Sequence, residues 1–248
     1  MSLPEVTSRE QWLVARKELL EREKELTRQR DALSADRRRL PMVKIDKDYT
    51  FEGPTGRVGL AELFDGRRQL ILQHVMFGPS WDAVCDGCTA SLDEMAPGLF
   101  VHLQSRDTSF AAVSRAPLAK LAAVKASKGW DFPWYSSFGS DFNYDYQVTL
   151  DETVAPVEYN FRTRAEHVRA GTEGADFGRE PAERPGVSCF LRDGDDIFHT
   201  YSTFARGTDQ LGGSYTFLDL TALGRSEEWE EPKGRSSQSH GADPTFTD

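Results

Sequence analysis

Large apolar residues recur every seven positions near the start of the chain, between Ser8 and Leu40. An apolar line that returns every two turns predicts a long helix, which Ser8 can cap with Gln11 at the third helical position. The companion positions of a coiled-coil seam are small or polar, so we interpret the segment as a helical arm laid across its own domain. A dimerisation arm is the alternative. The line consists of Trp12, Leu19, Leu26, Leu33 and Leu40.

Beyond Pro41 the pattern changes to short strands and helices. Residues Gln69 to Phe77 form a near-continuous apolar run, which is typical of a central strand buried on both faces. Thr108 to Arg115 predicts a second buried strand, and Pro117 suits the first turn of a helix that runs to about Lys128. Strand, helix, strand and helix at this spacing predict an α/β fold with a parallel core.

The C-terminal half contains one clear hairpin and two polar segments. Val187 to Phe204 alternates around a turn at Asp193-Gly194, which predicts two antiparallel strands. We therefore expect a helical arm over residues 1–40 and a main domain over residues 41–224, with a loop insertion at about 151–186. Residues 225–248 are too polar to fold alone and are expected to form a flexible tail.

Charge and composition narrow the classes of function. The 248 residues carry a formal net charge of -10, which argues against a general nucleic-acid binder. The predicted arm itself is basic, with ten Lys and Arg residues against seven Asp and Glu. No apolar run approaches the roughly 20 residues that cross a bilayer, and the first residues lack a secretory signal pattern. We therefore expect a cytoplasmic protein that binds neither membrane nor nucleic acid.

Two of the three cysteines stand three residues apart, in Cys85-Asp86-Gly87-Cys88. At a strand-to-helix junction, the unpaired N–H groups and the helix dipole can stabilise a Cys85 thiolate, and Cys88 can then resolve a mixed disulfide. Gly87 leaves room for the partner sulfur. The carboxylates of Asp82 and Asp86 oppose a thiolate, so we expect a less acidic, more reducing pair. Two incidental buried thiols in a binding module are the alternative.

A metal site is a second hypothesis for the same cysteines. Structural zinc needs four ligands, and the chain has no second C-x-x-C pair. His74, on the strand before the cysteines, and His199, on the late hairpin, could complete a copper or zinc site with Cys85 and Cys88 if the fold brought them together.

Peroxidase chemistry is a third possibility. Peroxiredoxins place Pro seven residues and Thr or Ser three residues before the reactive cysteine. Here those positions hold Gly78 and Asp82, so the peroxidase motif is not met. Arg115, at the end of the next strand, could still approach a Cys85 thiolate.

Several longer strings carry a resemblance to a known family. They are "AAVSRAPLAKL", "FPWYSSFGSDFNYDY", "FHTYSTFARG" and "FLDLTALGR", together with the opening "REQWLVARKELLEREKELTRQRDALSADRRRLP". With them, nearly the whole chain up to about Glu228 resembles a bacterial family of thioredoxin-like proteins that are classed as predicted dithiol–disulfide oxidoreductases. The resemblance implies a thioredoxin-like fold of the peroxiredoxin-like variety, a redox pair at Cys85 and Cys88, a thiol or disulfide substrate (protein or small molecule), and no cofactor.

One departure from thioredoxins concerns the strand that faces the disulfide. Thioredoxins place a cis-proline immediately before that strand, whereas matching "CFLRDG" to it puts Gly186 there and Pro185 one residue early. Cys189 on that strand is expected to be a small core residue, with a third redox partner as the alternative. An aromatic block at Phe132 to Tyr146 could pack the core or line a pocket. The candidate pocket residues are Trp81, Arg115, Gly186, Val187, Trp134 and Tyr144.

Overall fold

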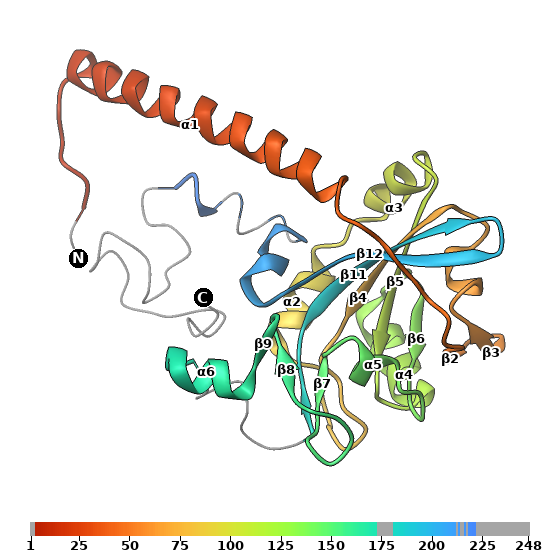
Figure 1. Cartoon of the computed structure of the whole chain (residues 1–248). Helices are drawn as coiled ribbons and strands as arrows, with labels where there is room; N and C mark the ends of the chain where they lie inside the picture. The colour runs from red at the N-terminus through yellow and green to blue at the C-terminus, as the bar shows by residue number, and fades with distance from the viewer. Residues whose placement is uncertain (1–2, 173–180, 212, 214–215, 217, 222–248) are drawn as a thin grey trace.

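An eight-stranded mixed sheet forms the centre of the protein (Figure 1). The computed structural model describes residues 3–172, 181–211, 213, 216 and 218–221. The strand order is β1-β12-β11-β4-β5-β6-β2-β3. The middle strands are β4 (Gln69–His74), β5 (Thr108–Ser114), β6 (Trp134–Ser136), β11 (Gly186–Asp193) and β12 (Asp196–Phe204).

The middle strands confirm the predicted fold class. β4, β5 and β6 run parallel, while β11 is antiparallel to both β4 and β12. Two antiparallel strands beside a parallel trio, with a helical crossover after β4, make a thioredoxin-like α/β arrangement. The predicted hairpin is also confirmed, because Asp193 pairs with Asp196 across a turn that contains Gly194 at φ 61°.

Short strands extend the sheet at both edges and form two small ladders beside it. At the edges, β1 (Val43–Lys44) pairs with β12, and β2 (Thr50–Gly53) lies between β6 and β3 (Gly56–Gly59). The ladders are β7 (Thr149–Leu150) with β10 (Ala182–Glu183), and β8 (Glu158–Tyr159) with β9 (Arg162–Thr163). The segment at 151–186, expected to be a loop, therefore contains short strands and a helix; residues 173–180 and the expected tail at 225–248 lie outside the described residues.

Helices cover the sheet, and each face of it has its own apolar core. The helices are α2 (Asp86–Asp93), α3 (Pro97–Gln104), α4 (Leu118–Lys128), α5 (Phe142–Asp145) and α6 (Arg164–Ala170), with short 3₁₀ helices at Glu62–Phe64 and Ala205–Leu211. Leu70 and Leu72 of β4 point into one core with Phe142. Val75, just after β4, points into the other core, which side chains of α2, α3 and α4 complete. The alternation along β4 decides which face each residue meets.

The predicted N-terminal helix is confirmed as α1 (Arg9–Arg37), with both hydrogen bonds of a capping box between Ser8 and Gln11. Its interpretation as an arm laid across its own domain is wrong for the part of the chain that the structure describes. No residue of α1 is buried there, and Figure 1 shows the helix projecting away from the sheet. Among the described residues, no helix is long and apolar enough to cross a membrane.

Candidate functional site

The cysteine pair lies where β4 ends and α2 begins. The Cys85 N–H donates to the carbonyl of Met76 at 3.1 Å, which ties the loop back to the strand. Cys85 is the N-cap of α2, with extended backbone angles (φ -53°, ψ 133°), and its carbonyl accepts the first helical bond from Thr89. The first turn of α2 therefore points unpaired N–H groups toward the Cys85 sulfur.

The pKa values of the two thiols are shifted in opposite directions. The thiol of Cys88 donates a hydrogen bond to the Cys85 sulfur, and this bond is the largest cause that lowers the pKa of Cys85 to about 6. Partial burial opposes it, while the backbone N–H groups of Cys88 and Gly87 add to it. The same hydrogen bond, with burial, holds the pKa of Cys88 well above its usual value. Cys88 is buried, and its Sγ also accepts from the Met76 N–H at 3.5 Å.

The expectation of a less acidic Cys85 is therefore wrong. Asp86 does raise the pKa of Cys85, as predicted, but its effect is the smallest of the causes. The donors at the helix start outweigh it because they contact the sulfur directly, whereas a solvated carboxylate acts through water. Both thiols are reduced in this structure.

Lys120, from the first turn of α4, fixes the loop that precedes the cysteines. Its ammonium donates to the carbonyls of Pro79 at 3.0 Å and Trp81 at 2.7 Å. A turn at Gly78 brings the Trp81 ring so close that a Cβ at Gly78 would lie 3.0 Å from it. Two carbonyls on one ammonium and a tight glycine turn hold this loop in one conformation. Trp81 is partly buried against the same apolar core as Cys85 and Cys88.

Arg115 follows β5 and is engaged by a carboxylate rather than by a thiolate. Its guanidinium forms an ion pair with Glu183 at 3.0 Å and lies over the ring of Tyr144 at 4.8 Å. Glu183 is only 3% exposed and also accepts a hydrogen bond from Thr149 at 2.8 Å. Burial raises the pKa of Glu183, although Arg115 and Thr149 oppose that rise. The structure thus brings the predicted Arg115 and Tyr144 together around a carboxylate that the sequence reading did not single out.

Three other candidate residues lie in strands or in the core. Trp134 is 2% exposed and donates to the Ser114 hydroxyl at 3.0 Å, so its proposed place in a pocket wall is wrong. Gly186 pairs with His74, the last residue of β4, and Val187 with Gln73. Both lie near the strand end from which the cysteine loop leaves. A Cβ at Gly186 would meet the ring of Phe204 at 2.8 Å, so only glycine fits there.

Cys189 lies further along β11, opposite Ile71 of β4. Burial raises the pKa of Cys189 to about 11, so it is a protonated, half-buried thiol at neutral pH. Its position three residues before the end of β4 separates it from the loop by roughly 10 Å along the strand.

The metal alternative, with His74 and His199 beside the cysteines, is wrong for the described residues. Leu70, Leu72 and His74 alternate onto one face of β4, whereas Cys85 and Cys88 pack against the core on the other face. The sheet lies between them, and no group of three or more metal-ligating side chains occurs in the described part of the chain.

The two histidines are connected to each other instead. The His74 Nε2 lies 2.9 Å from the Ser188 hydroxyl, which lies 2.8 Å from the Ser202 hydroxyl, which lies 2.7 Å from the His199 Nε2. This histidine–serine chain crosses β4, β11 and β12. Complete burial lowers the pKa of His74 to about 3, so His74 is neutral. Neither serine was singled out from the sequence, since nothing marks a strand serine as a hydrogen-bond partner.

Comparisons with solved structures give distant similarities in fold. A peroxiredoxin Q of Xanthomonas campestris is 13% identical, with 66% of this chain and 86% of that chain covered and a TM-score of 0.41. The peroxidoxin BcpB of Mycobacterium tuberculosis is 17% identical, with 69% and 94% covered and a TM-score of 0.36. A protein of Chlorobium tepidum described as a thiol:disulfide interchange protein DsbE is 14% identical, with 69% and 93% covered and a TM-score of 0.36.

At such identities the chemistry has to be argued from the residues of this chain. No curated protein matches it. A family profile does match residues 1–242, which is nearly the full length, and the chain therefore belongs to the family described as "Bacterial protein of unknown function (DUF899)".

Proposed function

We propose that this protein is a thiol–disulfide oxidoreductase, with Cys85 as the nucleophile and Cys88 as the resolving thiol. The observation that carries the proposal is the asymmetry of the pair. Cys85 is half-buried at the start of α2 with a pKa of about 6, and Cys88 is a buried thiol that donates to it. Dithiol exchange needs one thiolate to attack and one thiol held within reach to complete the reaction.

The proposed reaction has two exchange steps. The Cys85 thiolate attacks one sulfur of a substrate disulfide, the substrate S–S bond breaks, and one substrate sulfur leaves as a thiolate that takes up a proton. Cys88 then loses its proton and attacks the Cys85 sulfur of the mixed disulfide, which releases the second substrate thiol. The substrate gains two electrons, and the protein is left with a Cys85–Cys88 disulfide that a dithiol reductant must reduce.

The acidity of Cys85 bears on the direction of electron transfer. A pKa of about 6 lies between the values of about 7 for thioredoxin and about 3.5 for a strong oxidant. A stabilised thiolate favours the reduced form of the pair, which makes the disulfide form a stronger oxidant. We therefore expect the pair to be somewhat more oxidising than the two aspartates alone suggested. In a reducing compartment such as the cytoplasm, the Cys85–Cys88 disulfide would be reduced back to the dithiol.

The substrate is proposed to be a disulfide of a protein or of a small molecule. Trp81 precedes the pair in the loop, and Gly186 and Val187 start the neighbouring strand β11 at the end from which that loop leaves. Gly186 and Val187 are buried and pair with both β4 and β12, so their backbone has no free side for a substrate chain. Trp81, which is partly buried in the loop, is the residue proposed to contact the substrate.

The test is disulfide reduction by purified protein with dithiothreitol as the electron source. Cys85→Ser should abolish turnover. Cys88→Ser, mixed with the substrate disulfide in the absence of dithiothreitol, should stop after one attack and accumulate a mixed disulfide that intact-mass measurement detects. Cys189→Ser is the matched control and should turn over like the wild type. Full activity of the Cys85→Ser variant would refute the nucleophile. A wild type that never forms the Cys85–Cys88 disulfide under mild oxidation would favour a binding module with incidental thiols.

A further inference from the structure

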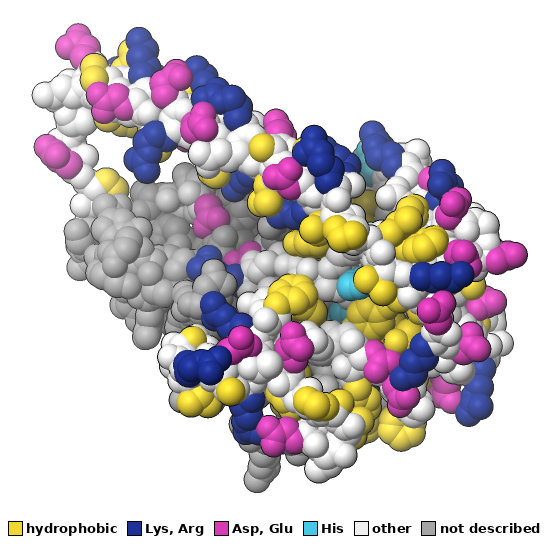
Figure 2. All heavy atoms as spheres, in the orientation of Figure 1, with side chains coloured by type: hydrophobic (Ala, Val, Ile, Leu, Met, Phe, Trp, Pro, Cys, Tyr) yellow, Lys and Arg dark blue, Asp and Glu magenta, His cyan; other side chains and the backbone are white. Residues whose placement is uncertain are grey.

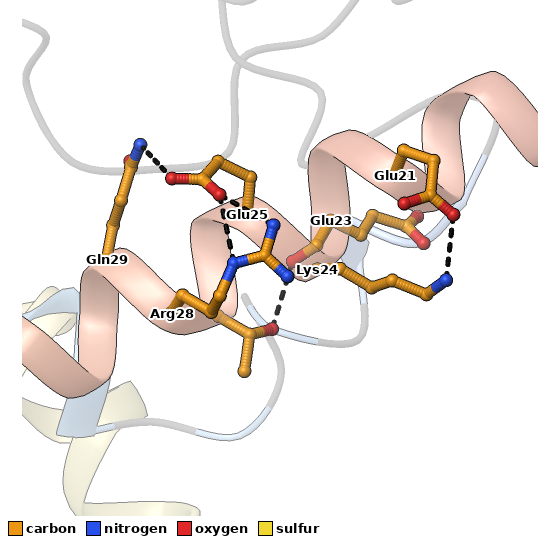
Figure 3. Close-up of polar contacts among 7 residues, drawn as sticks. Glu21, Glu23, Lys24, Glu25, Arg28 and Gln29 are labelled. Atoms are coloured by element: carbon orange, nitrogen blue, oxygen red, sulfur yellow. Dashed lines mark hydrogen bonds and ion pairs between the residues drawn. The ribbon is translucent and has the colours of Figure 1, made fainter.

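The ion pairs in the described part of the chain lie mostly at its surface. On α1, for example, Glu25 pairs with Arg28 at 2.6 Å in full contact with water (Figure 3), and Figure 2 shows charged side chains of both signs spread over the face in view. The pair of Arg115 and Glu183 differs, because its side chains are only 13% and 3% exposed and come from segments 68 positions apart. A buried ion pair contributes little net stability, so stability alone does not account for it.

This ion pair lies at the same edge of the sheet as the two cysteines. β4 and β5 are parallel, and their register, continued past their ends, sets Arg115 level with Met76. A hydrogen bond of 2.8 Å from the residue after Arg115 to the Phe77 carbonyl continues the pairing. Met76 holds both cysteines: its carbonyl accepts from the Cys85 N–H, and its N–H donates to the Cys88 Sγ. Neighbouring strands are about 4.8 Å apart, so the Arg115 backbone lies one strand away from the residue that positions the redox pair.

The turn at Gly78 connects the ion pair to the loop before the cysteines. A Cβ at Gly78 would lie 3.0 Å from the ring of Trp81 and 3.4 Å from the Cγ of Glu183. Because glycine has no side chain, the indole and the glutamate both approach the same point. Glu183 in turn holds the guanidinium of Arg115 at 3.0 Å. A substrate in contact with Trp81 therefore lies next to Arg115.

Arg115 has N–H groups left for a ligand. One of its nitrogen atoms donates to Glu183, and the guanidinium lies over the ring of Tyr144 at 4.8 Å, whose hydroxyl it also approaches. A guanidinium has five N–H groups. No further residue in the described part of the chain accepts from Arg115, and none of its nitrogen atoms is a buried donor without a partner, so the remaining N–H groups face solvent. The indole N–H of Trp81 likewise has no hydrogen-bond partner among the described residues.

These donors match a carboxylate. A guanidinium that is fixed along one side and stacked on a ring presents its free N–H groups in the planar geometry that a carboxylate accepts. The ammonium of Lys120 adds positive charge to the same loop, because its partners there are two carbonyls and not a carboxylate. Asp82 and Asp86 also lie near the cysteines, but both are exposed, so water screens their repulsion of an anion.

We propose that Arg115, together with the indole N–H of Trp81, binds a carboxylate of the disulfide substrate, so that the protein prefers disulfides that carry an anionic group. This inference rests on the proposed function, because it names the substrate class of the Cys85–Cys88 pair. The guanidinium holds the carboxylate while the Cys85 thiolate attacks a sulfur of the same molecule. Glu183 is a positioning residue, since it fixes the guanidinium without touching the substrate.

Single-turnover exchange between the reduced protein and two disulfides of matched size tests the preference. The probes are glutathione disulfide and its ethyl ester, in which the carboxylates are blocked, and the reaction of each probe with mercaptoethanol supplies its intrinsic rate. Relative to that reference, we expect Cys85 to react roughly tenfold faster with the free acid than with the ester. The net charge of -10 by itself favours the ester, so a preference for the acid indicates a local cation. Equal relative rates, or a preference for the ester, would overturn the proposal.

A second pair of probes distinguishes the source of the carboxylate. It consists of an extended peptide disulfide with glutamate beside each cysteine and the same peptide with glutamine there. A larger preference within this pair would identify a protein substrate, and a larger preference within the glutathione pair would identify a small molecule.

Variants locate the preference. Arg115→Met with Glu183→Gln removes both charges, so no buried charge is left unpaired, and the preference for the free acid should disappear. Trp81→Phe keeps an aromatic ring but loses the indole N–H, so it should lower the preference and tests the proposal should the double variant fail to fold. Arg57→Met is the matched control: its side chain is 80% exposed on β3, and the preference should persist. A preference that survives the substitutions at Arg115 and Glu183 would overturn the proposal.

The outcomes separate this inference from the proposed function. Turnover with dithiothreitol but no preference for the free acid would overturn the carboxylate site alone and leave the oxidoreductase in place. If Cys85 reacted with neither member of either pair, the proposed function would fail, and the carboxylate site would fail with it.

Discussion

Replacing Cys88 with alanine should make Cys85 a weaker acid. The hydrogen bond from Cys88 is the largest cause of the low pKa of Cys85, and Cys88→Ala removes it. A hydrogen bond to a charged group contributes about 1.5–3 kcal/mol, and one pKa unit corresponds to about 1.4 kcal/mol. The pKa of Cys85 should therefore rise from about 6 to roughly 7–8. Part of the depression remains, because the N–H groups of Gly87 and of residue 88 still donate to the sulfur.

The rate of Cys85 alkylation by iodoacetamide, followed against pH by peptide mass spectrometry, measures this change. At pH 7 the thiolate fraction should fall from about nine-tenths to between a tenth and a half, so the rate should fall roughly two- to tenfold. At pH 10 Cys85 is a thiolate in both proteins and the rates should agree. Cys88→Ser is the matched control, because a serine hydroxyl can still donate and should give a smaller shift. An unchanged midpoint in the Cys88→Ala variant would show that the helix start, and not Cys88, acidifies Cys85.

Three further predictions concern the surroundings of the pair. Lys120→Met removes both hydrogen bonds to the loop carbonyls and should lower the free energy of unfolding by about 1–3 kcal/mol, measured by urea titration. The control Lys125→Met, on the same helix, loses one hydrogen bond of 3.4 Å and should lower the free energy of unfolding by less. Gly87→Ala would place a Cβ 4.0 Å from the Cys85 sulfur. The substitution should raise the melting temperature slightly, because alanine favours a helix over glycine by about 0.5–1 kcal/mol. It should also slow the reduction of a protein disulfide more than the reduction of a small-molecule disulfide, and equal slowing of both substrates would contradict this account. Ser188→Ala leaves the His74 Nε2 without its partner and should destabilise the protein by about 1–3 kcal/mol, and a change below 0.5 kcal/mol in the same titration would refute the role of that hydrogen bond.

The elements with strong local patterns could be predicted from the sequence. The heptad line and the Ser8–Gln11 cap predicted α1, and the apolar runs predicted β4 and β5, because each pattern reflects a single period along the chain. The Cys85–Cys88 pair followed from its place between a buried strand and a helix. Local pattern determines local structure, and these features depend on little else.

Features that join distant segments could not be predicted in the same way. Glu183 meets Arg115 across 68 positions, and its place in a polar segment gave no sign of burial. The acidity of Cys85 depends on three donors fixed by the start of α2, which the count of nearby aspartates did not reveal. The position of the arm was also misjudged, since a heptad line states that a helix needs a partner but not which one.

The histidine–serine chain has a consequence for proton position inside the sheet. Each hydroxyl donates once, so the chain has two directions, and all of its hydrogen bonds must point the same way. When His199 is neutral and its Nε2 accepts from Ser202, the hydrogen atom of His74 must sit on Nε2. When the partly exposed His199 takes up a proton, its Nε2 must donate, both hydroxyls turn around, and the hydrogen atom of His74 moves to Nδ1. The tautomer of a fully buried imidazole in β4 is thereby set by the charge of another imidazole two strands away, and ¹⁵N chemical shifts of the two rings would follow both together.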